Sequence, residues 1–250
     1  MNKEFSYEEY VTDKSFLDAY NDYQQKYTST IRESDRVMLT LVSEWLAQNH
    51  PSNRPSLLDV GCSTGNFLLH LKRLCGERLK LTGGDLAVSS LDACRANPDL
   101  AGINFEVLDI TALPESTYDL IVVNAVLYMF MEDQYQSALG SLRKALKPGG
   151  AVLVFDFAHE FAQDIEIMEK TSSHPNGLRL CFRPMTKVIA SAKAARFSKV
   201  EFRPFVLPID LPRPADNAEI ITYTVKNEQG SRMAFRGTLY QPWCHMIMRA

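Results

Sequence analysis

One stretch, residues 57–67, constrains the fold more than any other part of the chain. The apolar run Leu57-Leu58-Asp59-Val60 includes an acid, and a loop of small residues follows at once, Gly61-Cys62-Ser63-Thr64-Gly65-Asn66. A helix-like apolar pattern begins at Phe67. This order is typical of a buried parallel strand that passes into a helix through a tight turn. Such a turn exposes backbone N–H groups at a helix N-terminus, which favours a ligand with an anionic end or many acceptors.

The spacing of the small residues narrows the class of ligand. They fall at Gly61, Ser63 and Gly65, whereas the dinucleotide fingerprint G-x-G-x-x-G needs a glycine at the position of Asn66. The stretch resembles the first motif of the class I methyltransferases that use S-adenosylmethionine. Ser63 departs from the family pattern, because serine disfavours positive φ. The resemblance implies that the methionine part of S-adenosylmethionine, whose product is S-adenosylhomocysteine, is held by Asp59, Gly61, Cys62, Ser63, Gly65 and Asn66.

Apolar runs alternate with helix-like segments from Ser56 to Phe157, which predicts βαβ units and a doubly wound, mostly parallel α/β sheet with helices on both faces. The resemblance implies seven strands, the last two of them antiparallel neighbours. We predict strands at 57–60, 79–85, 103–108, 118–124, 151–157, 199–205 and 239–248, and helices at 67–74, 88–96, 132–146 and 186–195.

Two further acids follow predicted strands. Asp85 ends the second strand and Asp109 follows the third, so their loops should open at the same edge of the sheet. A carboxylate at the second strand end can accept both ribose hydroxyls of a nucleoside. The resemblance implies that Asp85 and Leu86 hold the ribose, and that Asp109 and Ile110 hold the adenine. The alternative is that each aspartate only caps a helix or loop.

The end of the fourth strand bears on the substrate. The chain has Asn124-Ala125-Val126-Leu127-Tyr128 where adenine-N6 and glutamine methyltransferases carry Asn/Asp-Pro-Pro-Tyr/Phe. The missing platform, the net charge of −3 and the pI of about 6.0 argue against a nucleic-acid substrate. The resemblance places Asn124 and Ala125 under the methionine part. Tyr128 is expected either to face the acceptor or to be a packed helix residue.

Histidine is the expected catalytic residue. His159 follows the fifth strand, where a neutral imidazole could accept a proton from a hydroxyl acceptor. The alternative is a loop histidine bonded to the backbone. Tyr20, in the N-terminal region, and His174, in the loop-like segment 172–177, are further candidates to contact the substrate.

The ends of the chain are predicted to elaborate one methyltransferase domain at 56–250. Residues 1–55 form a helical cap, whose tyrosines either pack in the core or cover the site. A proline-rich stretch and a hairpin signal predict an inserted arm at 206–238. We expect this arm either to cover the acceptor or to bind a second copy of the chain in a homodimer.

Composition indicates a soluble, cytoplasmic protein with no membrane partner. The five cysteines form no C-x-x-C pair and no zinc spacing, and the longest apolar run, residues 120–131, is too short to span a bilayer. The resemblance implies an S-adenosylmethionine-dependent methyltransferase, and the expected function is O-methyl transfer to a small molecule. Two alternatives remain: an NAD-dependent oxidoreductase, since Asp85 also suits an NAD ribose, and a non-catalytic protein that binds S-adenosylmethionine.

Overall fold

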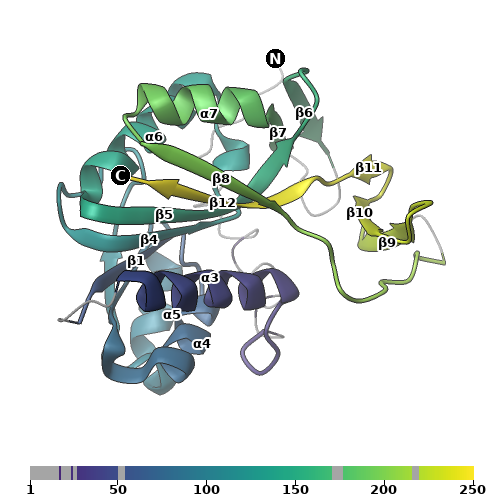
Figure 1. Cartoon of the computed structure of the whole chain (residues 1–250). Coiled ribbons are helices and arrows are strands. Elements are labelled where there is room, and N and C mark those ends of the chain that lie inside the picture. The colour runs from purple at the N-terminus through teal and green to yellow at the C-terminus, as the bar shows by residue number, and fades with distance from the viewer. Residues whose placement is uncertain (1–16, 18–23, 25–26, 50–53, 171–176, 216–219) are drawn as a thin grey trace, which may run out of the picture.

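A nine-stranded sheet forms the centre of the molecule in the computed structural model, which describes residues 17, 24, 27–49, 54–170, 177–215 and 220–250 (Figure 1). The main path has the order β3-β2-β1-β4-β5-β12-β8, and β6 and β7 join it beside the end of β5. The strands are β1 (Ser56–Val60), β2 (Lys80–Asp85), β3 (Asn104–Val107), β4 (Tyr118–Asn124), β5 (Leu146–His159), β6 (Ile165–Glu169), β7 (Leu178–Pro184), β8 (Lys199–Pro204) and β12 (Trp243–Arg249).

The pairing of these strands confirms the predicted doubly wound sheet. β1 runs parallel to β2 and β4, β2 to β3, and β4 to β5, whereas β12 runs antiparallel to both β5 and β8. Since parallel neighbours need crossover connections, the carboxyl ends of β1 to β5 open at one edge of the sheet. We call this the carboxyl edge.

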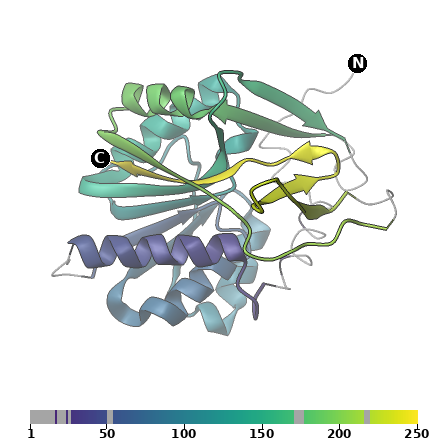
Figure 2. The ribbon, with the colours of Figure 1, turned by 45° about the vertical axis from the view of Figure 1, so that its right-hand side comes forward.

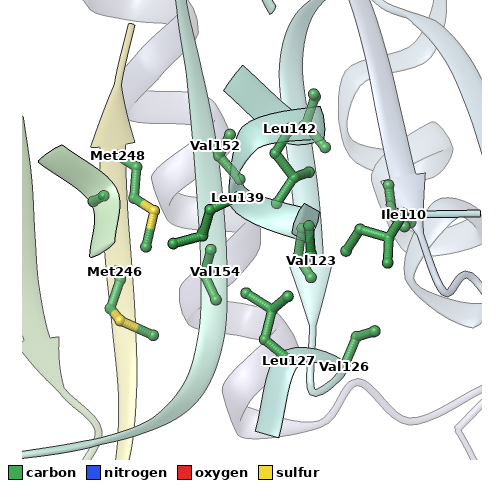
Figure 3. Packing of buried hydrophobic residues seen from close by; sticks show 14 of the residues in the cluster. Ile110, Val123, Val126, Leu127, Leu139, Leu142, Val152, Val154, Met246 and Met248 are labelled. Atoms are coloured by element: carbon green, nitrogen blue, oxygen red, sulfur yellow. The ribbon is translucent and has the colours of Figure 1, made fainter. Parts of the chain in front are cut away.

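Helices cover both faces of the sheet (Figure 1). One face carries α3 (Glu33–Asn49), α4 (Asn66–Cys75) and α5 (Val88–Ala96), and the other carries α6 (Glu132–Ala145) and α7 (Met185–Ala194). Short 3₁₀ turns lie at η1 (Gly76–Arg78), η2 (Pro98–Leu100) and η3 (Leu127–Met129). Successive residues of β5 point to opposite faces, so Val152 and Val154 join the α6 core in Figure 3 while Leu153 joins the α3 core.

Helix α3 belongs to this layered core. Met38, Val42 and Trp45 are buried in the same apolar cluster as Leu57 and Leu153 of the sheet. Their spacing follows the 3.6-residue period of a helix with one buried face. The described part of the predicted N-terminal cap therefore packs on the sheet next to α4.

Strand β5 is longer than the predicted 151–157. At its start, Leu146 pairs with Tyr118 across a register shift, and at its end Ala158 and His159 pair with β7. The antiparallel hairpin of β6 and β7 was not predicted. Because β6 is largely exposed, it shows no apolar run of the kind that marks a buried strand.

The inserted arm is a three-stranded antiparallel sheet of β9 (Thr222–Lys226), β10 (Arg232–Arg236) and β11 (Leu239–Tyr240). Figure 2 shows it beside the start of β12. The predicted last strand, 239–248, is two strands because Gln241 and Pro242 interrupt it, and proline has no N–H to donate. Arg236 of the arm forms an ion pair with Glu169 of β6 at 3.1 Å.

The arm leaves and rejoins the sheet at one place. The N–H of Phe205, just after β8, donates to the carbonyl of Trp243, at the start of β12, at 2.9 Å.

Within the described residues, no helix is both long enough and apolar enough to cross a membrane. All five cysteines are buried free thiols.

Candidate active site

The glycine loop between β1 and α4 holds three residues in the left-handed region, Gly61 (φ 73°), Ser63 (φ 48°) and Gly65 (φ 75°). The N–H groups of Gly61 and Cys62 both donate to the carbonyl of Gly84, at 2.7 and 3.1 Å. Gly65 is the N-cap residue of α4, so the free N–H groups of the first helical turn lie at this loop. A serine at positive φ carries backbone strain, which is typical of functional loops.

The loop has no room for side chains at its two glycines. A Cβ on Gly61 would lie 2.6 Å from Cγ2 of Val126, and one on Gly65 would lie 2.8 Å from Cδ1 of Leu100. Val126 belongs to the segment after β4. The glycine loop and the β4–α6 loop (residues 125–131) therefore pack directly against each other.

Asp85, at the end of β2, is bonded to this loop. Its Oδ2 accepts the Ser63 N–H at 2.8 Å, and its Oδ1 accepts the Ala87 N–H at 2.9 Å across Leu86. Burial raises the pKa of Asp85, and these N–H groups oppose the rise. Each carboxylate oxygen has a second lone pair, so Asp85 can still accept hydrogen bonds from a ligand.

Asp109 lies at the same edge as Asp85. β2 and β3 are parallel neighbours in which Asp85 pairs with Val107, and Asp109 follows two positions later. Oδ1 of Asp109 accepts from the backbone N–H and the hydroxyl of Thr111, at 2.8 and 2.7 Å. The side chain of Ile110 is buried in the α6 core, so only its backbone is suited to a polar ligand.

Two more carboxylates lie close to the loop. Asp59 in β1 is 2% exposed. Burial raises the pKa of Asp59 well above its ordinary value, and the charges of Asp35 and Asp85 are the next largest causes of this rise. Asp35, in the first turn of α3, is also 2% exposed, and its Oδ1 accepts from Asn124 Nδ2 at 2.8 Å. The sequence predicted only a helical cap over residues 1–55, so the place of Asp35 in the site was missed.

The N-terminal segment before α3 is bonded to α4. Nδ2 of Asn66 donates to the carbonyl of Gln24 at 2.8 Å, and Nε2 of His70 lies 2.8 Å from the carbonyl of Tyr27. Arg73 donates to the carbonyl of Thr28 at 3.1 Å. The Asn66 amide, predicted to bind a ligand, thus fixes Gln24 in this structure.

Aromatic side chains lie beyond Asn124, and Tyr128, Phe157 and Trp243 form what we call the aromatic wall. Ala125 adopts a φ of 57° and donates its N–H to Phe155 at 2.8 Å. The ring of Tyr128 lies 5.4 Å from Phe157 and 6.0 Å from Trp243. Trp243 in turn stacks on Phe155 at 4.6 Å. Trp243 was not predicted, because only the pairing of β12 with β5 brings it here.

His159 lies further along β5. Phe155 pairs with Asn124, and His159 follows four positions later, about 13 Å away along the strand. Its Nε2 lies 3.2 Å from the carbonyl of Phe182, and its Nδ1 is buried without a hydrogen-bond partner. The other two substrate candidates, Tyr20 and His174, lie outside the described residues.

The carboxyl edge therefore combines three elements with distinct chemistry. The loop and Asp85 offer backbone donors and carboxylate acceptors for a nucleoside. Asp35 and Asp59 add two buried carboxyl groups, whose ionised forms a nearby cation would stabilise. The aromatic wall of Tyr128, Phe157 and Trp243 offers an apolar surface.

Comparisons with known sequences agree with this arrangement. Residues 57–150 match the sequence profile of a family described as a methyltransferase domain. The chain is 26% identical over 169 residues to a tRNA N(3)-methylcytidine methyltransferase of Schizosaccharomyces pombe, over 59% of this chain and 53% of that protein. It is 30% identical over 122 residues to a carboxy-S-adenosyl-L-methionine synthase of Pseudomonas putida, over 44% of this chain and 49% of that protein. The chain thus spans about half the length of these relatives.

The fold also resembles solved structures. The Burkholderia thailandensis 1,6-didemethyltoxoflavin-N1-methyltransferase, solved with bound 1,6-didemethyltoxoflavin and S-adenosylhomocysteine, aligns over 99% of this chain and 91% of its own, with a TM-score of 0.58 and 15% identity. A Haloferax volcanii putative methyltransferase, solved with the activator Trm112, aligns over 96% of this chain and 97% of that chain, with a TM-score of 0.61 and 16% identity. At these identities the likeness concerns the fold.

Proposed function

Since the chain belongs to the class I S-adenosylmethionine-dependent methyltransferases, we propose that it transfers a methyl group from this cofactor to a hydroxyl group of a small molecule. The observation that carries the proposal is the junction of the glycine loop with Asp85 through the Ser63 N–H at 2.8 Å. It joins the part of the site suited to a methionine moiety with the part suited to a ribose.

The charges at the loop fit the cofactor. When bound, S-adenosylmethionine supplies an electrophilic methyl group on a sulfonium. Burial raises the pKa of Asp59, and the charges of Asp35 and Asp85 raise it further. A cationic sulfonium and ammonium oppose this rise. In this proposal Asp85 accepts from the ribose hydroxyls and Asp109 from the adenine amino group.

The aromatic wall supports a small acceptor with an apolar or planar body. Tyr128 and Trp243 are both half-buried and lie beyond the end of β4, where an acceptor must meet the methyl group. The protein's work in such a displacement is alignment and exclusion of water, which stacked rings achieve. The negative net charge does not favour a nucleic acid.

His159 is the proposed general base. A carbonyl oxygen only accepts hydrogen bonds, so the contact with Phe182 fixes the proton on Nε2 and leaves Nδ1 as the acceptor. Among the residues that the structure describes, none is hydrogen-bonded to this Nδ1. Because His159 lies about 13 Å along β5 from the level of Asn124, this role requires an acceptor that extends over Phe157.

Titration calorimetry with S-adenosylhomocysteine tests the cofactor part. Asp85→Asn replaces one acceptor oxygen with a donor, so either Ser63 or Ala87 loses its partner together with a ribose contact. We expect affinity to fall about tenfold or more. Asp92→Asn, an exposed acid on α5, is the matched control and should bind as wild type does. Binding of NAD without S-adenosylhomocysteine would instead support an oxidoreductase.

Transfer of labelled methyl groups tests the acceptor part. Wild-type protein is incubated with labelled S-adenosylmethionine and, separately, with a metabolite extract and with bulk tRNA, since one relative acts on tRNA. We expect label only in the small-molecule fraction, and at least tenfold less with His159→Ala. Label in tRNA would contradict the small-molecule proposal. Binding without any transfer would indicate a non-catalytic protein.

A further inference from the structure

Asp156 on β5 and Arg183 on β7 are buried side chains of opposite charge that the proposed reaction does not use. They are 3% and 4% exposed. Asp156 lies on the α6 side of the sheet, since its β5 neighbours Val154 and Ala158 belong to that core. Charged side chains this deeply buried are rare unless their surroundings bind them.

Arg183 is bonded to the β4–α6 loop. Its Nη1 donates to the carbonyl of Leu127 at 3.3 Å, and its Nη2 donates to the carbonyl of Phe130. The thiol of Cys181 also donates to Phe130, at 3.3 Å. The guanidinium lies over the ring of Tyr135 at 3.9 Å, which fixes its plane. A planar fork that binds two carbonyls of one short turn determines where that turn lies.

Asp156 faces the same loop from β5. Its Oδ1 accepts the Phe157 N–H at 2.7 Å, and its Oδ2 is buried without a partner of normal hydrogen-bond geometry. Burial raises the pKa of Asp156 to about 7. The charge of Arg183 and the N–H groups of Tyr128 and Leu127 favour the ionised form and oppose this rise. The titratable and charged groups that face Asp156 are Arg183 and Cys181 on β7, Tyr135 on α6 and Cys244 on β12.

The other side of the loop contacts both halves of the site. Val126 occupies the space beside Gly61, and Tyr128 packs on Phe157 and Trp243. Figure 3 shows Val126 and Leu127 among the side chains of the α6 core. A shift of this loop must therefore move the support of the glycine loop and the aromatic wall together.

We propose that Arg183 is a positioning residue that holds the β4–α6 loop through the Leu127 and Phe130 carbonyls, so that Val126 supports the cofactor loop and Tyr128 faces the acceptor. In this proposal a change in the charge of Asp156, two residues before the β5 partner of Arg183, shifts the loop. The inference rests on the proposed function for the meaning of the two sites. The bonds of Arg183 to the loop do not depend on that function. Neither residue touches the reacting atoms, so their effect passes through residues 126–130.

The experiment uses Trp243 as a reporter of the wall. The sequence has two tryptophans, so Trp45→Phe leaves Trp243 alone. In this background, emission is followed from pH 5 to 9, and S-adenosylhomocysteine binding is measured at pH 8. We expect an emission transition with a midpoint near pH 7, which Asp156→Asn abolishes. Arg183→Lys should weaken binding at least fivefold, whereas Arg143→Lys, which alters an exposed arginine bonded to the Arg196 carbonyl, should not.

Three results would overturn the proposal. One is a Trp45→Phe protein whose Trp243 emission shows no transition between pH 6 and 8. This test leaves both Asp156 and Arg183 unchanged. Another is an Asp156→Asn protein that keeps the transition, which would then come from another group. The last is Arg183→Lys binding as tightly as Arg143→Lys. If wild type fails to bind S-adenosylhomocysteine, the proposed function fails, but the emission transition still tests the effect of Asp156 on the loop.

Discussion

Gly61→Ala is the change whose cost the structure defines most closely. At a φ of 73° an alanine meets the left-handed penalty of about 1–2 kcal/mol, and part of this is offset by about 0.4–1 kcal/mol because alanine restricts the unfolded chain. Its Cβ would also lie 2.6 Å from Val126 Cγ2, an overlap that adds about 1–3 kcal/mol. We expect Gly61→Ala to lower the free energy of unfolding by about 2–4 kcal/mol.

Gly149→Ala separates the two costs. Gly149 has a φ of 78°, and a Cβ there meets nothing within 4 Å, so only the backbone penalty, about 1 kcal/mol, remains. Urea unfolding of both variants measures the difference, and calorimetry with S-adenosylhomocysteine measures the effect on the site. We expect Gly61→Ala to lose at least tenfold in affinity and Gly149→Ala to change less than twofold.

A double variant identifies Val126 as the cause. Val126→Ala removes Cγ2, so Gly61→Ala/Val126→Ala should be about 1–3 kcal/mol more stable than the sum of the single changes predicts. The reasoning would be refuted by equal costs at positions 61 and 149, or by additivity within about 0.5 kcal/mol in the cycle.

Three further outcomes follow from strained and buried groups. Ser63 and Ser116 both have a φ of 48°, so replacing either by glycine should raise the free energy of unfolding by about 0.5–1 kcal/mol. Ser63→Gly should leave S-adenosylhomocysteine affinity unchanged, because glycine keeps the backbone N–H that is bonded to Asp85. The pKa of Asp156 in the folded protein is about 7, above its ordinary 3.8, so ionisation of Asp156 destabilises the fold. As the pH rises from 4 to 8, the free energy of unfolding of Asp156→Asn, measured in urea, should therefore gain about 2–4 kcal/mol relative to that of wild type. Burial lowers the pKa of His245 from 6.5 to about 4, so wild type should lose about 3 kcal/mol relative to His245→Gln as pH falls through that window, and parallel curves would contradict this.

The sequence predicted those parts of the fold that local patterns determine. β1 and β4 are buried on both faces, so each carries an apolar run with a sharp end. β2 is buried too, and Asp85 marks its end. The glycine loop and Asp85 follow directly from such ends. β6 escaped prediction because it is short and largely exposed, and its two glutamates interrupt the apolar residues that mark a buried strand.

The rest of the site depends on contacts between distant residues. Asp35 meets Asn124 across 89 positions, and His245 bonds to the carbonyl of Ser34 across 211. Neither pair shares a local motif, so only the packing of α3 on the sheet brings them together. Trp243 likewise reaches Tyr128 only because β12 pairs with β5. The roles of His159 and Asp109 stay predictions.

The single crossing point of the arm has an evolutionary consequence. Phe205 and Trp243 are joined by one backbone hydrogen bond, so β8 and β12 keep their pairing whatever chain connects them. A lineage could lengthen, shorten or exchange the intervening cassette without disturbing the strands that carry Asp59 and Asp85. The arm could then diverge quickly on a framework of strands that changes slowly.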